Sequence, residues 1–193
     1  MPTIKSEGLM SKNSNLTPVL TEIIINWHEK AKERGYPALE LDDDWPSPCA
    51  QSNSEGTFWQ PVLQSDHTNS KKSFDNVGEA FEIEINQQYS DLFTLYFSDN
   101  LNMKHEKGDF QLLQVWSDDD FERFQQNLVG HLLMKQKLKQ KPTLFFALTE
   151  QDDLNLVVDN TTGEVCLEYV GKEPHETIAN NLTEFLEKSE LVF

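Results

Sequence analysis

Three strand-forming segments near the end of the chain constrain the fold most strongly. Residues 143–149 are a continuous apolar run, which is typical of a central strand. In residues 154–159 and 164–170, apolar and polar side chains alternate, as in strands that bury one face. The connections are short, and one is the turn Asn160-Thr161-Thr162-Gly163, so neighbouring strands must run in opposite directions. This region therefore predicts an antiparallel sheet.

Four other segments have apolar residues at helical spacing. Thr17 and Pro18 suit the start of the first helix, and Gly35 suits its end. Ser117 can cap another helix, whose first turn carries aspartates that suit the helix dipole. Pro174 is expected to begin the last helix. The predicted helices cover residues 18–34, 87–98, about 118–138, and a final segment with Ile178, Ala179, Leu182, Phe185 and Leu186 on one face.

The remaining segments are less regular. Residues 36–75 are rich in Pro, Ser, Asn and Asp, with an edge strand expected at 58–63 and an exposed, mobile loop at 64–75. Residues 77–85 fit either a strand or a short helix. Short strands near 100–105 and 109–116 flank the turn Lys107-Gly108 and predict a hairpin.

The order of these elements predicts an α+β class, with one domain whose largely antiparallel sheet is flanked by helices. The length of 193 residues agrees with a single domain. Residues 1–15 are polar and without periodicity, so we expect a flexible tail there and a single domain over residues 16–193.

Net charge limits the partners that such a chain can bind. Sixteen basic and thirty-three acidic residues give −17. This argues against nucleic acid and against an anchor on anionic lipid, because both need clustered Lys and Arg. Residues 40–120 alone carry seventeen acids and four bases, including the runs Asp42-Asp43-Asp44 and Asp118-Asp119-Asp120. A surface that only serves solubility remains an alternative.

The sequence also favours the cytosol. The first fifteen residues have no apolar segment of the kind that export signals contain, and the longest clean apolar run, 144–148, is too short to span a membrane. Cys49 and Cys166 are expected to be reduced, buried thiols, with a disulfide or a reactive cysteine as the alternative.

No motif indicates catalysis. His28-Glu29 resembles the start of a zinc-protease motif, but Lys32 stands where the second histidine is required. His131 lies within a predicted helix and is expected to serve packing. The glycines are too scattered for a nucleotide-binding loop, and carboxylates are too numerous for any pair to be informative. We therefore expect no enzyme, no cofactor, no metal site and no small-molecule substrate.

Several short motifs follow one another between about residues 20 and 187. They are Trp45-Pro46-Ser47-Pro48-Cys49, Trp59-Gln60-Pro61, Glu79-Ala80-Phe81, Gly108-Asp109, the segment 114–121 (QVWSDDDF), the segment 127–132 (NLVGHL), Pro142-Thr143-Leu144-Phe145, Gly163-Glu164-Val165-Cys166, and the segment 181–186 (NLTEFL). In this order they resemble the Syd family of SecY-interacting proteins, within the wider SUKH (Smi1/Knr4-like) fold group. The α+β fold that this resemblance implies agrees with the element order above.

The resemblance implies a partner as well as a fold. It implies a non-enzymatic protein that docks, through an acidic concave surface, on basic cytoplasmic loops of SecY, the export channel, and regulates or checks its assembly state. Such a protein would be cytoplasmic and loosely associated with the inner membrane through SecY, without inserting into it. The charge permits this partner, because cytoplasmic loops of membrane proteins carry an excess of Lys and Arg. An immunity protein of the SUKH type that neutralises a basic toxin is the alternative.

The acidic residues at the ends of predicted elements are the candidate docking residues. Side chains from separate elements can converge there on one groove. Asp118 to Asp120 also have a simpler role as a helix start. We expect Trp59 and Trp116 to be mainly structural. The predicted patch is centred on Glu79, Glu82, Asp109, Asp118, Asp119 and Asp120, and is extended by Asp42, Asp43 and Asp44.

Overall fold

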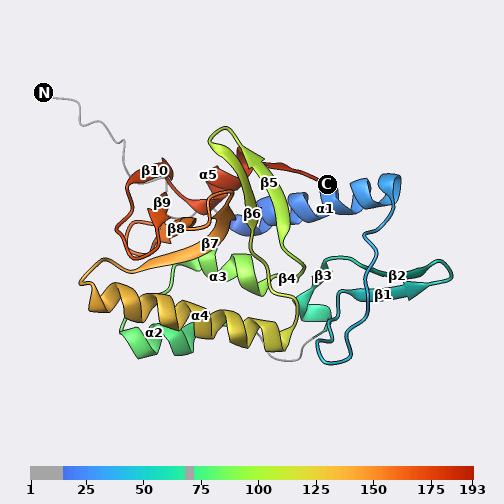
Figure 1. The fold of residues 1–193 in the computed structure, drawn as a ribbon, viewed down its shortest axis with the longest axis horizontal. Coiled ribbons are helices and arrows are strands. Elements are labelled where there is room, and N and C mark those ends of the chain that lie inside the picture. Colours follow the sequence, from blue (N-terminus) through green and yellow to red (C-terminus); the bar gives the residue numbers. More distant parts are fainter. Residues whose placement is uncertain (1–14, 68–71) are drawn as a thin grey trace, which may run out of the picture.

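A seven-stranded antiparallel sheet forms the centre of the fold in the computed structural model, which describes residues 15–67 and 72–193 (Figure 1). Across the sheet the strand order is β10-β9-β8-β7-β6-β5-β11. Its members are β5 (Leu101–His105), β6 (Gly108–Leu112), β7 (Thr143–Thr149), β8 (Leu154–Asp159), β9 (Val165–Tyr169), β10 (Glu176–Ala179) and β11 (Glu190–Leu191). The α+β class and the antiparallel sheet are confirmed.

The three strands predicted near the end of the chain are adjacent in this sheet. Leu144 of β7 pairs with Val158 of β8, and Val157 of β8 pairs with Cys166 of β9. Residues 156–159 of β8 are all buried, so both faces of this part of the strand are covered, whereas its alternating pattern is typical of a strand that buries one face. The apolar run and the two alternating segments therefore correspond to the strands that they predicted.

Within the described residues, five α-helices flank the sheet. Asn15, rather than Thr17, caps the first, because its side chain accepts a hydrogen bond from the Thr17 amide. Ser117 caps the fourth as predicted, accepting from the Asp120 amide at 3.2 Å. The helices are α1 (Leu16–Arg34), α2 (Asp75–Phe81), α3 (Gln87–Thr94), α4 (Asp118–Lys137) and α5 (Leu182–Glu187).

Aromatic rings join three of these helices in the core. α4 packs on β7 and on α2, whereas α1 contacts α3, α5 and β11. The Phe93 ring of α3 lies 4.2 Å from that of Phe124 of α4 and 5.0 Å from that of Tyr89 (centroid distances). Phe74, just before α2, lies 5.2 Å from Phe121 of α4. The interior between α4 and α3 is thus largely aromatic.

The prediction of the last helix is wrong for its first half. Residues after Pro174 form β10, which pairs with β9 at the edge of the sheet, and only then does α5 begin. Asn181 accounts for the break, because its side chain accepts a hydrogen bond from the Glu184 amide and so starts a helix there. A strand of four residues is too short for its periodicity to be distinguished from that of a helix.

Two other predicted elements are shorter than expected. The helix predicted at 87–98 ends at Thr94, because residues Tyr96–Phe97 form β4, which pairs with β3 (Val62–Leu63). The strand predicted at 109–116 ends as β6 at Leu112. Residues 77–85, which fitted either element, are helical up to Phe81, and Glu82 then takes a left-handed conformation (φ 54°).

The irregular segment 36–75 contains more structure than predicted. β1 (Ala50–Asn53) and β2 (Gly56–Trp59) form a hairpin that projects from the fold (Figure 1). A short 3₁₀ turn, η1 (Gln64–Asp66), lies within the segment predicted to be an exposed loop, and Gln64 is buried. Of that loop, residues 68–71 lie outside the described residues, as do residues 1–14 of the predicted tail.

Both cysteines are buried and free, as predicted. Burial raises the pKa of the Cys49 thiol to about 12, so it stays protonated at neutral pH. Trp59 packs on Trp27, with ring centroids 4.7 Å apart, which agrees with its predicted structural role. Across residues 15–67 and 72–193, no helix combines the length and the apolar character needed to cross a bilayer.

Candidate functional site

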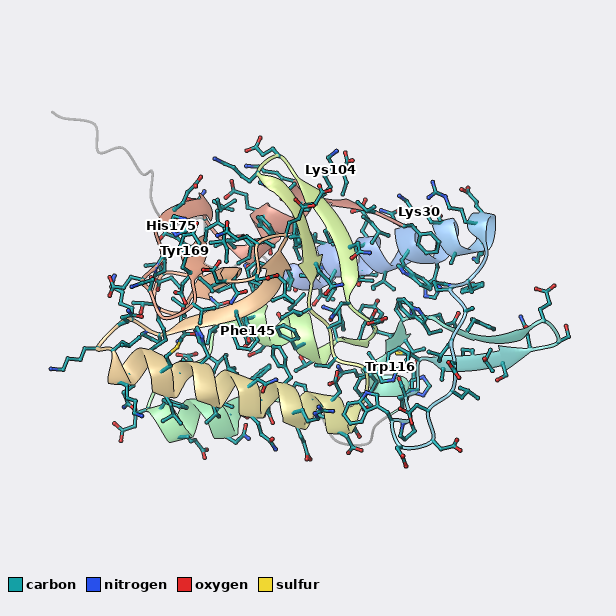
Figure 2. The ribbon with its side chains drawn as sticks, in the orientation of Figure 1. Lys30, Lys104, Trp116, Phe145, Tyr169 and His175 are labelled. Atoms are coloured by element: carbon teal, nitrogen blue, oxygen red, sulfur yellow. The ribbon has the colours of Figure 1, made fainter. Side chains whose placement is uncertain are left out.

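A cavity of about 630 Å³ opens where α4 begins. One wall is the segment between α1 and β1. The other comes from the residues that follow β6 (113–116), the first half of α4, Phe145 of β7 and the chain around Asp99. Figure 2 shows Trp116 near the first turn of α4 and Phe145 between α4 and the sheet. The cavity therefore joins parts of the chain that are distant in sequence.

Its charge is predominantly negative. Four carboxylates and one cation line the cavity, together with aromatic rings and apolar side chains. The charged residues are Glu40, Asp42, Asp99, Asp120 and Arg123, and the rings are Trp45, Trp116, Phe124 and Phe145. Asp120 is half-buried, and the other four charged residues are exposed. Such a lining suits a cationic ligand with an apolar stem.

Hydrogen bonds hold the irregular wall in place. The Ser47 hydroxyl donates to the Trp116 carbonyl and also accepts from the Cys49 amide at 3.0 Å. The Leu39 amide donates to the Thr57 carbonyl at 3.0 Å. The wall is thus fastened to the start of α4 at one point and to β2 at another.

Asp120 has a local role in addition to its place in the cavity. One of its carboxylate oxygens accepts from the Trp116 amide at 2.8 Å, while its own amide donates to the Ser117 hydroxyl. Part of its hydrogen-bonding capacity is therefore used to fix the turn into α4. Trp116 is half-buried, contacts Trp59 with ring centroids 6.2 Å apart, and still lines the cavity, so it combines packing with exposure to a ligand.

The nine acidic residues of the predicted patch do not line one groove. Asp42 and Asp120 line the cavity at the start of α4. Glu79 and Glu82 line a separate hollow beside α2. In Figure 1, α2 lies beside the later turns of α4, away from its start. Asp109 lines a third hollow, near the β5–β6 turn.

The other four acids of the patch are exposed. Asp43 and Asp44 follow Asp42 in the irregular wall. Asp118 and Asp119 lie in the first turn of α4, and Asp118 pairs with Lys72 at 3.0 Å. None of these four residues lines the cavity.

Sequence reasoning missed three charged residues of the cavity and one ring. Asp99 stands alone in its segment, so no local pattern marks it, and Glu40 lies just outside the run that begins at Asp42. Arg123 follows the acidic start of α4 and reads as an ordinary helix residue. Trp45, by contrast, stands directly after Asp42-Asp43-Asp44 in an irregular segment, and a large aromatic residue in such a place could have indicated a binding surface.

A second group of titratable residues is buried between α4 and the sheet. Lys135 Nζ lies 2.9 Å from Glu168 Oε2 and also donates to the Lys172 carbonyl. The Thr143 hydroxyl donates to Glu168 and lies 3.0 Å from His131 Nε2. Lys135 and Glu168 are each 1 % exposed. Together with Thr143 and His131, we call them the Lys135–Glu168 cluster. Neither member of the ion pair lines the cavity at the start of α4 or the hollows beside α2 and the β5–β6 turn. The burial of the pair indicates a structural role.

The cluster predicts a dependence of stability on pH. Burial, assisted by the charge of Lys135, lowers the pKa of His131 from 6.5 to about 4. Between these values the unfolded chain binds a proton at this site and the folded chain does not, so this residue's contribution to stability is lost as pH falls. The loss between pH 7.5 and 5 is expected to be about 2 kcal/mol.

The comparison of wild type with His131→Gln isolates this effect. Burial raises the pKa of Glu168, which acts in the opposite direction at low pH, but that contribution is present in both proteins. Urea unfolding at pH 7.5 and 5 should therefore show a smaller loss of stability in the variant. An equal loss in both would show that His131 is not responsible.

No group of three or more His, Cys, Asp or Glu side chains with metal-binding geometry occurs within the described ranges. His131 is half-buried and bonded to Thr143, which agrees with the packing role predicted for it.

Comparison with known proteins gives one consistent result. Residues 15–190 match the family model described as "Syd protein (SUKH-2)". Protein Syd of Alteromonas mediterranea is 46 % identical over 172 residues, covering 88 % of this chain and 92 % of the relative. For Protein Syd of Pseudoalteromonas atlantica the identity is 44 %, covering 79 % and 83 %. For that of Colwellia psychrerythraea it is 37 %, covering 92 % and 94 %. The chain belongs to the Syd protein family, as the order of its sequence motifs implied.

Proposed function

We propose that this chain is a non-enzymatic binding protein that docks on the basic cytoplasmic loops of the SecY channel, with the cavity at the start of α4 as its docking face. Its family resemblance supports SecY as the partner. It would reach the cytoplasmic face of the inner membrane through this partner and there regulate or check the assembly state of the channel.

The residues that line the cavity support its choice as the docking face. Four carboxylates against one cation surround a cavity that also presents aromatic rings. Basic loops supply Lys and Arg side chains, whose charges complement the carboxylates and whose stems pack on the rings. The net charge of −17 adds a long-range field that steers the protein toward positive loops and away from anionic lipid.

The first test reverses charge at two cavity residues. Glu40 and Asp99 are both exposed, so Glu40→Lys/Asp99→Lys should leave the melting temperature nearly unchanged. Binding to SecY in lipid nanodiscs should become roughly tenfold weaker at low salt, mainly through slower association, and the difference should shrink as salt is added. Association and dissociation rates are the measurements.

Two matched variants carry the same change in net charge. Glu187→Lys/Glu190→Lys alters exposed residues near the C-terminus, and Glu79→Lys/Glu82→Lys alters the hollow beside α2. If only the α2 variant weakened binding, the docking face would be that hollow. Equal weakening in all three would leave net charge as the sole determinant. Recovery of a soluble toxin instead of SecY in a pull-down would favour an immunity protein.

A further inference from the structure

Arg123 occupies an aromatic site inside the acidic cavity. Its guanidinium carbon lies 4.6 Å from the centre of the Trp45 ring, within the distance for cation–π attraction. Arg123 comes from the second turn of α4 and Trp45 from the irregular wall, and both line the cavity. The chain thus places one of its own cations where a cationic ligand would be attracted.

Little else holds the guanidinium in this position. The Arg123 side chain is exposed, and among the described residues no carboxylate lies within ion-pair distance of it. A long side chain held by one exposed ring contact can move away at small cost. When it moves, the Trp45 ring and the four carboxylates become available together.

A further lining residue lacks a hydrogen-bond donor. Gln114 is 5 % exposed, and its Nε2 donates to the Leu113 carbonyl at 2.7 Å. Its Oε1 is buried and has no partner among the described residues. A guanidinium carries five N–H donors, so an incoming arginine can supply the donor that Gln114 lacks, following a small side-chain adjustment.

We propose that Arg123 is an internal stand-in for an arginine of the partner, which displaces it and stacks on Trp45 when the partner docks. This proposal rests on the docking function above and specifies it further. It makes Trp45 the receiving ring, an arginine side chain the preferred occupant, and Arg123 a competitor that lowers affinity in the free protein. Selectivity for arginine over lysine follows because a planar guanidinium stacks on indole better than an ammonium does.

The binding test removes Arg123, the internal competitor for the Trp45 ring. Arg123→Gln should bind a synthetic peptide whose cations are all arginine about fivefold more tightly than wild type. Lys137→Gln, an exposed residue of the same helix, loses the same charge roughly 21 Å away along the axis and is the matched control. Adding Trp45→Leu to Arg123→Gln should abolish the gain, together with the preference over the same peptide carrying lysines.

A spectroscopic test uses the unmodified protein. The sequence contains only two arginines, Arg34 and Arg123, so the Nε–Hε signal of Arg123 is identified by its loss in Arg123→Gln. The Trp45 ring current should shift this signal in the free protein, and addition of the arginine peptide should return it to an ordinary position. A signal that stays shifted with the peptide bound would overturn the displacement.

The outcomes separate this proposal from the docking function. Equal gains in Arg123→Gln and Lys137→Gln, with wild type binding both SecY and the peptide, would overturn the stand-in role and leave docking intact. Failure of wild type and all variants to bind either SecY or basic peptides would overturn both.

Discussion

Replacing Lys135 by alanine should destabilise the protein by about 3–5 kcal/mol, because the change leaves the buried Glu168 carboxylate without its countercharge. Both side chains of this ion pair are almost fully buried, so water cannot replace the lost partner. Thr143 would remain as a hydrogen-bond donor but carries no charge. Urea unfolding at pH 7.5 measures the loss.

Two further variants identify its cause. Lys137→Ala changes an exposed lysine two residues later on the same helix, and its effect should stay within about 0.5 kcal/mol. The double variant Lys135→Met/Glu168→Gln removes both charges while keeping similar volumes, and it should recover most of the stability. If the double variant were less stable than Lys135→Ala, the uncompensated charge would not be the main cost.

Phe93→Ala should have an effect of similar size, about 3–5 kcal/mol, because the ring is fully buried among Phe74, Tyr89 and Phe124. The truncation removes apolar burial and leaves a cavity that rigid neighbouring rings cannot fill. For a chain of this length, the melting temperature should fall by roughly 10 °C.

Leu133→Ala, at an exposed apolar residue, is the control for Phe93→Ala. Leu133 is 49 % exposed on α4, and its truncation should change the melting temperature little. Phe93→Leu, which fills part of the space, should lie between the two. A loss in Leu133→Ala as large as that in Phe93→Ala would contradict the assignment of the core to the aromatic cluster.

Local sequence patterns predicted the elements whose apolar periodicity and end signals lie within one continuous segment. β7, β8 and β9 are adjacent in sequence and in space, so alternation and short turns were sufficient. α4 was predicted because its cap and its apolar face are both encoded within one segment. β10 was missed because a short edge strand takes its stability from pairing with β9, which periodicity does not report.

The cavity could be predicted only in part. Asp42 and Asp120 were identified from acidic runs, but Glu40, Asp99 and Arg123 join them only through tertiary contacts between distant segments. The same limit applies to the buried ion pair. Lys135 lies within the helix predicted at about 118–138, yet its partner Glu168 lies thirty-three residues later in a strand. The sequence could not show that the two meet.

The hydrogen-bonded attachment of the irregular wall has a consequence for the thermodynamics of docking. Ser47 fastens this wall to the Trp116 carbonyl, and Leu39 fastens it to Thr57, before any partner arrives. Conformational entropy is therefore lost on folding rather than on association. The remaining ordering cost falls on the partner. A basic loop already constrained by its own protein should bind more tightly than the same residues in a free peptide, and the difference should appear mainly as a less unfavourable entropy of binding.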